Sequence, residues 1–210
     1  MVPGHLDEAS IANEEEDHVG RIVVTEFVSL DGVMEDPGGS EGYKHGGWTF
    51  EFSRGDEGDK FKLDEALEAD ALLLGRVTYA GFAEAWPSRD GEFADKFNNM
   101  PKYVFSSTLG NPEWNNSTVL KGDLEEEVSK LRRDHNGDIV VHGSARLAQA
   151  LVEKGLVDEL RLMVFPVVLG SGKQLFDETT DKKRMRLVDS KIVGDGVAIL
   201  IYQPADGEAE

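Results

Sequence analysis

The feature that most limits the fold of this chain is a repeated order of a short apolar run, a glycine and a helical pattern. The run at 71–74 meets Gly75, and the run at 138–142 meets Gly143. Short apolar runs of this kind are typical of strands that are buried on both faces of a sheet. Because strands that alternate with helices favour parallel pairing, this order predicts an α/β fold.

The remaining patterns extend this prediction along the chain. We expect strands at 21–29, 71–74, 102–106, 118–120, 138–142, 159–168, 185–193 and 197–203. We expect helices at 56–68, 76–86, 123–134 and 144–154. The last two strands are joined by Gly194-Asp195-Gly196, which is typical of a hairpin. The sequence therefore predicts a three-layer α/β/α domain with a mixed, mostly parallel sheet and a C-terminal antiparallel hairpin.

Charge is concentrated at the two ends of the chain. The protein has 210 residues with 41 acidic and 22 basic side chains, for a net charge of −19. Residues 1–20 and 204–210 hold nine of the acids and no Lys or Arg, so we expect two acidic disordered tails around one domain at 21–203. The acidity disfavours a nucleic acid as partner, because a phosphate backbone would be repelled.

Several other classes are excluded by what the sequence lacks. There is no cysteine, which removes thiol catalysis, thiolate metal sites and disulfides and fits a reducing cytoplasm. No apolar run approaches the roughly 20 residues that span a bilayer, so we expect no membrane partner. The five histidines show no metal-ligand spacing, so we expect no metal site.

The two strand–glycine–helix junctions are candidate phosphate sites. A helix N-terminus presents unpaired N–H groups and a partial positive charge, and glycine lets a phosphate approach the backbone. Ligands of open α/β sheets lie beyond the carboxyl ends of the strands, so neighbouring ends can bind a dinucleotide. Arg76 can then meet a terminal phosphate. The alternative is that these are ligand-free turns, which any α/β protein contains.

Three further segments carry polar groups that can serve a site. Asp31 follows the first strand, where a carboxyl can anchor or protonate a substrate, but it can equally form an Asx turn before Gly32. Asp59 can face the same cleft or complement the dipole of its own helix. The hydroxyls at 106–108 can bind phosphate or satisfy a turn.

Five segments in order resemble the dihydrofolate reductase-like superfamily, and in particular stand-alone relatives of the reductase domain of riboflavin biosynthesis. They are SLDG at 29–32, LLLGRVTY at 72–79, YVFSSTL at 103–109, IVVHGSARLAQAL at 139–151 and VDELRLMVFPVVLGSGKQLF at 157–176. The resemblance covers about residues 21–202. It implies an NADPH-dependent reductase, and it implies a homodimer to which the apolar run at 162–168 can contribute, although that run serves the core equally well.

The resemblance also implies roles for particular residues. It places the cofactor phosphates at Gly75, Arg76 and Thr78, the adenosine side near Ser106, Ser107 and Thr108, and the pyrophosphate and nicotinamide over Gly143, Ser144, Ala145 and Leu147. Asp31 resembles the substrate-side aspartate of riboflavin-pathway reductases, and Asp59 is a second catalytic candidate. Tyr43, Trp48, Phe50 and Trp86 can cover an aromatic ring, or they can anchor the loop and the core.

The implied reaction is hydride transfer to a small heterocycle of the 5-amino-6-(5-phosphoribosylamino)uracil type. A dihydrofolate or pteridine substrate is the alternative within the reductases. A non-catalytic NADPH-binding or redox-sensing module is the alternative from another class. The glycine-rich loop at 33–50 does not match a riboflavin-intermediate site, so the substrate is less defined than the cofactor.

Overall fold

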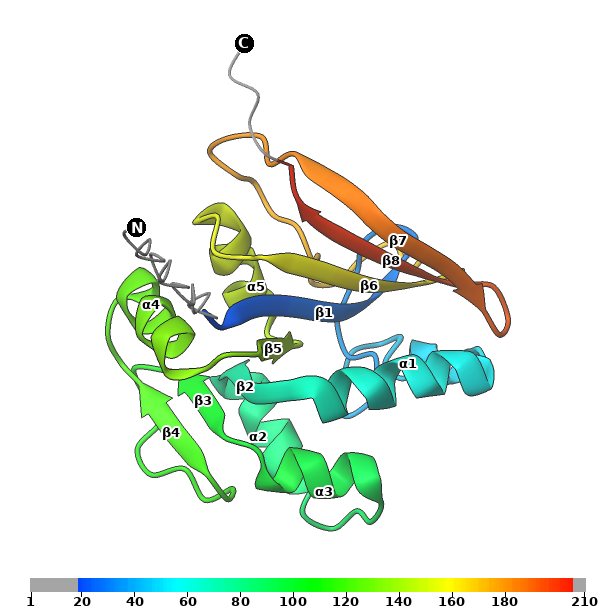
Figure 1. Ribbon diagram of the computed structural model, residues 1–210. Coiled ribbons are helices and arrows are strands. Elements are labelled where there is room, and N and C mark those ends of the chain that lie inside the picture. Colours follow the sequence, from blue (N-terminus) through cyan, green and yellow to red (C-terminus); the bar gives the residue numbers. More distant parts are fainter. Residues whose placement is uncertain (1–18, 206–210) are drawn as a thin grey trace, which may run out of the picture.

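An eight-stranded mixed sheet forms the centre of the computed structural model, which describes residues 19–205 (Figure 1). Its strands lie in the order β4-β3-β2-β5-β1-β6-β8-β7. Strands β1 to β6 pair in parallel, whereas β8 runs antiparallel to β6 and to β7. The strands are β1 (Arg21–Ser29), β2 (Ala69–Gly75), β3 (Lys102–Phe105), β4 (Ser117–Leu120), β5 (Asp138–His142), β6 (Glu159–Phe165), β7 (Met185–Val193) and β8 (Val197–Pro204).

Helices cover both faces of this sheet. They are α1 (Gly55–Glu68), α2 (Arg76–Ala85), α3 (Glu92–Asn99), α4 (Leu124–Asp134) and α5 (Ala145–Glu153), with a short 3-10 helix η1 (Trp48–Glu51). Apolar side chains of α1, α2 and α3 are buried with Val23 and Leu72 on one face. Those of α4 and α5 are buried with Ile22 and Val24 on the other face. The predicted three-layer architecture with its C-terminal hairpin is therefore confirmed.

The side chains of β1 are apolar on both faces of the sheet, which explains why helices can pack on both sides of it. Successive side chains of a strand point to opposite faces, and Ile22, Val23 and Val24 are all fully buried. Strand β1 lies between β5 and β6, so both of its edges are paired along much of its length. An apolar strand in this position anchors both helical layers.

Strand β5 ends earlier than its neighbour β1, which leaves a notch in the sheet at the position of the candidate site. Strand β5 ends at His142, which lies opposite Thr25 of β1. Strand β1 continues to Ser29 along β6, so its residues 26–29 have no strand beside them on the β5 side within the described part of the chain. The carboxyl ends of the parallel strands thus border an open space, which is where α/β sheets bind ligands.

Some expected elements differ from the structure. The predicted strand at 159–168 ends at Phe165, because Pro166 follows and cannot donate to the ladder. That strand lies between β1 and β8 and buries Leu162, so the apolar run serves the core, and the homodimer stays a prediction. Helix α3 was not expected, since it offers only one short apolar stripe around Phe93 and Phe97. The predicted acidic tails lie almost wholly outside the described residues.

No described helix is long and apolar enough to cross a membrane.

The most exposed strand is β7, at one edge of the sheet. Its apolar side chains at Leu187 and Ile192 are 48% and 67% exposed. The outer edge of β7 has no neighbouring strand within residues 19–205.

A buried lysine holds the connection between α3, β3 and β4. Lys102 is fully buried, and its Nζ donates to the carbonyl oxygens of Asn98, Met100 and Asn115 at 3.1, 2.8 and 2.9 Å. The ammonium also lies 4.4 Å from the ring centroid of Trp114. Burial lowers the pKa of Lys102 to about 8. These contacts offset the cost of burying the charge.

Replacing Lys102 with Met should therefore destabilise the protein. The variant loses the donor shared by three carbonyl oxygens, and we expect the free energy of unfolding to fall by about 2–4 kcal/mol in urea titrations. Lys182→Met changes an exposed lysine and is the matched control. Equal midpoints for the two variants would contradict this role.

Candidate active site

A large pocket opens at the carboxyl ends of the strands and has a volume of about 1960 Å³. Every residue that was predicted to contact a cofactor lines it: Gly75, Arg76, Thr78, Ser106, Ser107, Thr108, Gly143, Ser144, Ala145 and Leu147. Three segments that lie far apart in the sequence therefore meet around one space. The roles of these residues stay predictions, but their common location is a finding.

The two glycine turns are joined by one hydroxyl group. Ser144 Oγ accepts a hydrogen bond from Gly75 N at 2.7 Å and donates to Thr78 Oγ1 at 2.8 Å. Gly143 and Ser144 both have positive φ, at 58° and 66°. A Cβ atom at Gly143 would lie 3.1 Å from the Thr78 side chain, so the close approach of the turns requires glycine there. The link fixes the starts of α2 and α5 relative to each other.

These two helix starts differ from those of the other helices. Helices α1, α3 and α4 all carry acidic residues in their first turn, as the helix dipole favours. Helices α2 and α5 have no acid there. They carry Arg76 and Arg146 instead, and neither forms a salt bridge with any residue in 19–205. A cation at a helix N-terminus is unfavourable unless an anion lies beside it.

The donor set around the pocket fits the anionic part of a dinucleotide. Unpaired N–H groups at two helix starts and two free guanidinium groups point to phosphate oxygens as ligands. The hydroxyls of Ser107 and Thr108 add exposed donors at the rim. Ser106 is different, because it is buried and its Oγ accepts from the N–H groups of Thr108 and Leu109 within its own turn.

The floor of the pocket holds an unpredicted carboxyl group, that of Glu26. Its side chain is 5% exposed, and Oε2 accepts a hydrogen bond from Gly143 N at 3.1 Å. The other oxygen, Oε1, is buried without a partner in the described part of the chain. Burial raises the pKa of Glu26 to about 8, so the group is largely neutral at pH 7. The sequence offered one clue, an acidic residue between apolar and β-branched residues of a predicted strand.

A buried network of basic and acidic side chains lies beside Glu26, and two of its residues, Thr25 and Lys62, also line the pocket. Lys62 of α1 donates to Thr25 Oγ1 at 2.9 Å and pairs with Glu65. Arg161 of β6 lies 3.6 Å from Glu65 and 2.9 Å from Asp138. A buried network of this kind leaves each charge with a partner, so it orders α1 against β1 and β6.

His142 ends β5 at the edge of the pocket. Its ring lies 5.3 Å from that of Phe97 and 6.5 Å from that of Phe82, and its Nε2 is buried without a partner among residues 19–205. Burial lowers the pKa of His142 to about 3. The imidazole is therefore neutral at physiological pH and adds no positive charge to the pocket.

Of the two predicted catalytic carboxyls, Asp31 and Asp59, the structure places only Asp59 in the pocket lining. Asp31 does not line the pocket. Its Oδ1 accepts from Ser29 Oγ at 2.6 Å and from Leu169 N at 3.1 Å, and its Oδ2 accepts from Gly170 N at 2.7 Å. The hydrogen bond from Ser29 is the main reason why the pKa of Asp31 falls to about 2. The carboxylate thus fastens the loop at 169–170 to the end of β1 instead of forming the expected Asx turn before Gly32, and its predicted substrate contact has no geometric support.

Asp59 does line the pocket, but it is exposed and paired. Its carboxylate lies 2.7 Å from Arg54 Nη2, and its side chain is 65% exposed. The group therefore sits at the rim, where solvent weakens the ion pair. Asp59 remains a candidate for contact with a substrate.

The aromatic residues of the long loop are divided between core and pocket. Trp48 is 1% exposed, packs 5.4 Å from the Phe165 ring and donates from Nε1 to the carbonyl of Glu35, so its predicted substrate contact is excluded by burial. Tyr43 donates to the carbonyl of Ser171 and lies outside the pocket lining. Phe50 is 79% exposed and lines the pocket. Trp86 lines it as well.

Among residues 19–205, no group of three or more His, Asp or Glu side chains is placed to hold a metal ion. The donors of the pocket are backbone N–H groups, hydroxyls and guanidinium groups. These groups suit an organic anion, because divalent metals require several oxygen or nitrogen acceptors.

The family model described as the RibD C-terminal domain matches residues 21–199, and the chain belongs to that family. The predicted resemblance is thereby confirmed.

Relatives and solved structures agree with this membership. The uncharacterized Bacillus subtilis proteins YyaP and YwjB are 29% and 28% identical, over 87% and 82% of this chain and 94% and 91% of theirs. A candidate riboflavin biosynthesis protein from Shewanella sp. PV-4 superimposes with a TM-score of 0.72 at 21% identity, covering 88% of this chain and 99% of that one.

A second solved structure is a two-activity enzyme. The diaminohydroxyphosphoribosylaminopyrimidine deaminase/5-amino-6-(5-phosphoribosylamino)uracil reductase of Thermotoga maritima gives a TM-score of 0.61 at 14% identity. The likeness covers 89% of this chain and 57% of that chain. At these identities the structural likeness establishes the fold.

The fastening role of Asp31 can be tested directly. Asp31→Ala removes the acceptor of two backbone N–H groups, and we expect the loss of about 1–2 kcal/mol in unfolding free energy and faster amide exchange at Leu169 and Gly170. Affinity for pocket ligands should be retained. A variant with unchanged exchange rates but lost ligand binding would favour the substrate-side role instead.

The pKa of Glu26 predicts a pH-dependent stability. The group ionises near pH 4.5 in the unfolded chain and near pH 8 in the folded protein, so the unfolded state releases its proton first and stability falls as pH rises between these values. Glu26→Gln should remove this loss, on the order of 1 kcal/mol per pH unit across that window. Urea titrations at several pH values measure it, with Glu126→Gln, an exposed site outside the pocket lining, as the control. Parallel profiles of wild type and Glu26→Gln would contradict the assignment.

Proposed function

We propose that this chain is an NADPH-dependent reductase that acts on a small heterocyclic substrate. The observation that carries the proposal is the pair of helix starts at α2 and α5. In a chain with a net charge of −19, these two starts lack acids, carry Arg76 and Arg146, and line one pocket. A ligand with separate phosphate groups satisfies both starts at once.

The chemistry is divided between cofactor and protein. NADPH, when bound, supplies a hydride to an electron-poor carbon of the substrate. The turns at Gly75 and Gly143 hold the phosphates, and Arg76 favours the extra phosphate of NADPH over NADH. The exposed ring of Phe50 and the ring of Trp86 offer apolar surface for a flat heterocycle.

The substrate class follows from family membership and pocket chemistry. Membership of the RibD C-terminal domain family supports a pyrimidine of the 5-amino-6-(5-phosphoribosylamino)uracil type. A dihydrofolate or pteridine substrate is the alternative within the reductases, since it is also a flat heterocycle. The unpaired polar atoms of Glu26 and His142 belong to residues of the pocket lining, where a bound ligand can satisfy them. Family membership favours an enzyme over an idle binding module.

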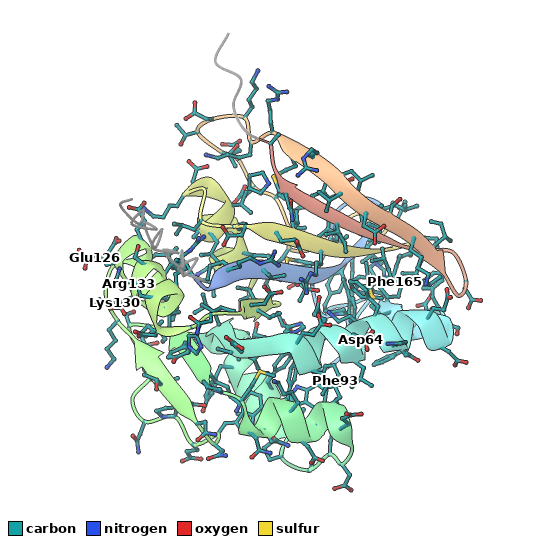
Figure 2. The ribbon with its side chains drawn as sticks, viewed as in Figure 1. Asp64, Phe93, Glu126, Lys130, Arg133 and Phe165 are labelled. Carbon is teal, nitrogen blue, oxygen red and sulfur yellow. The ribbon has the colours of Figure 1, made fainter. Side chains whose placement is uncertain are left out.

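The first experiment is a titration of the protein with NADPH and NADH, followed by fluorescence. We expect NADPH to bind more tightly, and Arg76→Ala to weaken NADPH roughly tenfold or more and to remove the preference. Arg133→Ala is the control, since Arg133 lies on the outer side of α4 (Figure 2). Absence of NADPH binding by the wild-type protein would refute the proposal.

Turnover separates the three candidates. Loss of NADPH absorbance is measured with 5-amino-6-(5-phosphoribosylamino)uracil, dihydrofolate and dihydropterin in turn. Oxidation with the first supports the pyrimidine reductase, and oxidation with either of the others supports a pteridine reductase. NADPH binding without oxidation across the panel supports the non-catalytic module.

A further inference from the structure

Glu26 combines three properties that no other pocket-lining carboxyl in the described residues combines. Its side chain is 5% exposed, it lines the pocket, and one of its oxygens has no partner. Asp36 is equally buried, but its oxygens accept hydrogen bonds from the N–H groups of three loop residues. The unpartnered oxygen of Glu26 is therefore unexplained by the fold alone.

The position of Glu26 connects it to the space where a ligand would lie. It is the first residue of β1 beyond the end of β5, in the notch of the sheet. Its Oε2 is held by the N–H group of Gly143, which opens the turn before α5. Because one oxygen is fixed by the turn, the carboxyl has a defined orientation and keeps Oε1 for another partner.

We propose that the Glu26 carboxyl is the proton donor that completes the reduction of the substrate in this pocket. The inference rests on the proposed function and adds the acid that such a reaction needs. NADPH supplies two electrons and one hydrogen to the carbon of a C=N or C=O group. The electron pair of that double bond moves to the nitrogen or oxygen, which takes the proton from Glu26 Oε1. The carboxylate that remains recovers a proton from solvent before the next turnover.

The surroundings of Glu26 explain how it keeps a proton until it is needed. Burial raises its pKa, and the negative charge of Glu65 on α1 adds to this effect, whereas the Gly143 N–H group and Lys62 oppose it. His142 on β5 is neutral and contributes no positive charge. Arg161 on β6 is engaged by Glu65, Asp138 and Glu159. General acids work best when their pKa lies near the working pH. The pKa of Glu26, at about 8, meets that condition.

The first test follows the carboxyl group itself and does not require turnover. Protein labelled with ¹³C at the glutamate side-chain carboxyl is titrated and followed by infrared or NMR spectroscopy, and the Glu26→Gln variant identifies the signal. We expect a neutral carboxylic acid at pH 7 that titrates with a midpoint near 8. A Glu26 signal that is already ionised at pH 6 would overturn the proposal.

The second test measures the reaction. Glutamine keeps the acceptor for Gly143 N–H and the size of the side chain, so Glu26→Gln should fold and bind NADPH with unchanged affinity. We expect its single-turnover rate of NADPH oxidation, with whichever panel compound the wild type reduces, to fall by about 10²–10⁴-fold. The wild-type rate should decline as the pH rises through 8. The Glu126→Gln variant changes an exposed glutamate of α4 outside the pocket lining and should behave as the wild type.

The outcomes separate the two proposals. If the wild type binds no NADPH, the proposed function fails and this inference fails with it. If NADPH binds and Glu26→Gln reacts as fast as the wild type, the inference alone fails. If no panel compound is reduced, the carboxyl titration decides, since an ionised Glu26 at neutral pH has no proton to give.

Discussion

The hydroxyl group of Ser144 is the contact on which the site depends. It accepts from the N–H group of Gly75 and donates to the hydroxyl of Thr78, which lie 69 and 66 residues before Ser144 in the chain. It thereby ties the turn at Gly143 to the turn at Gly75. Parallel pairing of β2 with β5 brings the turns into reach, and the hydroxyl then sets their spacing. Without this bond, two helix starts would still exist, but they would not form one rigid edge of a pocket.

Much of the fold could be predicted from the sequence because its strands and helices follow strong periodic patterns. The order of apolar run, glycine and helix predicted the central strands β2 and β5 and their helices, and Gly194-Asp195-Gly196 predicted the closing hairpin. Helix α3 was missed because eight residues with a single apolar stripe give a weak pattern. The end of β6 was misplaced because the apolar run continues past Pro166, where strand pairing stops.

The candidate site was predicted less evenly, for a physical reason. Glycines and hydroxyls at strand ends can be identified from local order, and all of those predicted line the pocket. The hydrogen-bond partners of a side chain often belong to segments that are far away in the chain. The neighbouring sequence therefore does not reveal them. Asp31 is fastened to N–H groups of Leu169 and Gly170, and Glu26 is held by Gly143, so neither environment was visible in the sequence.

The arrangement of charge has a consequence for how fast a ligand arrives. The chain as a whole repels anions, while the starts of α2 and α5 attract them only at short range. A phosphate-bearing molecule therefore meets a long-range barrier before it meets a local well. Added salt screens the long-range repulsion more than the short-range attraction at the helix starts. Moderate ionic strength should therefore raise the association rate of an anionic ligand with this pocket. For basic nucleotide-binding proteins, added salt has the opposite effect.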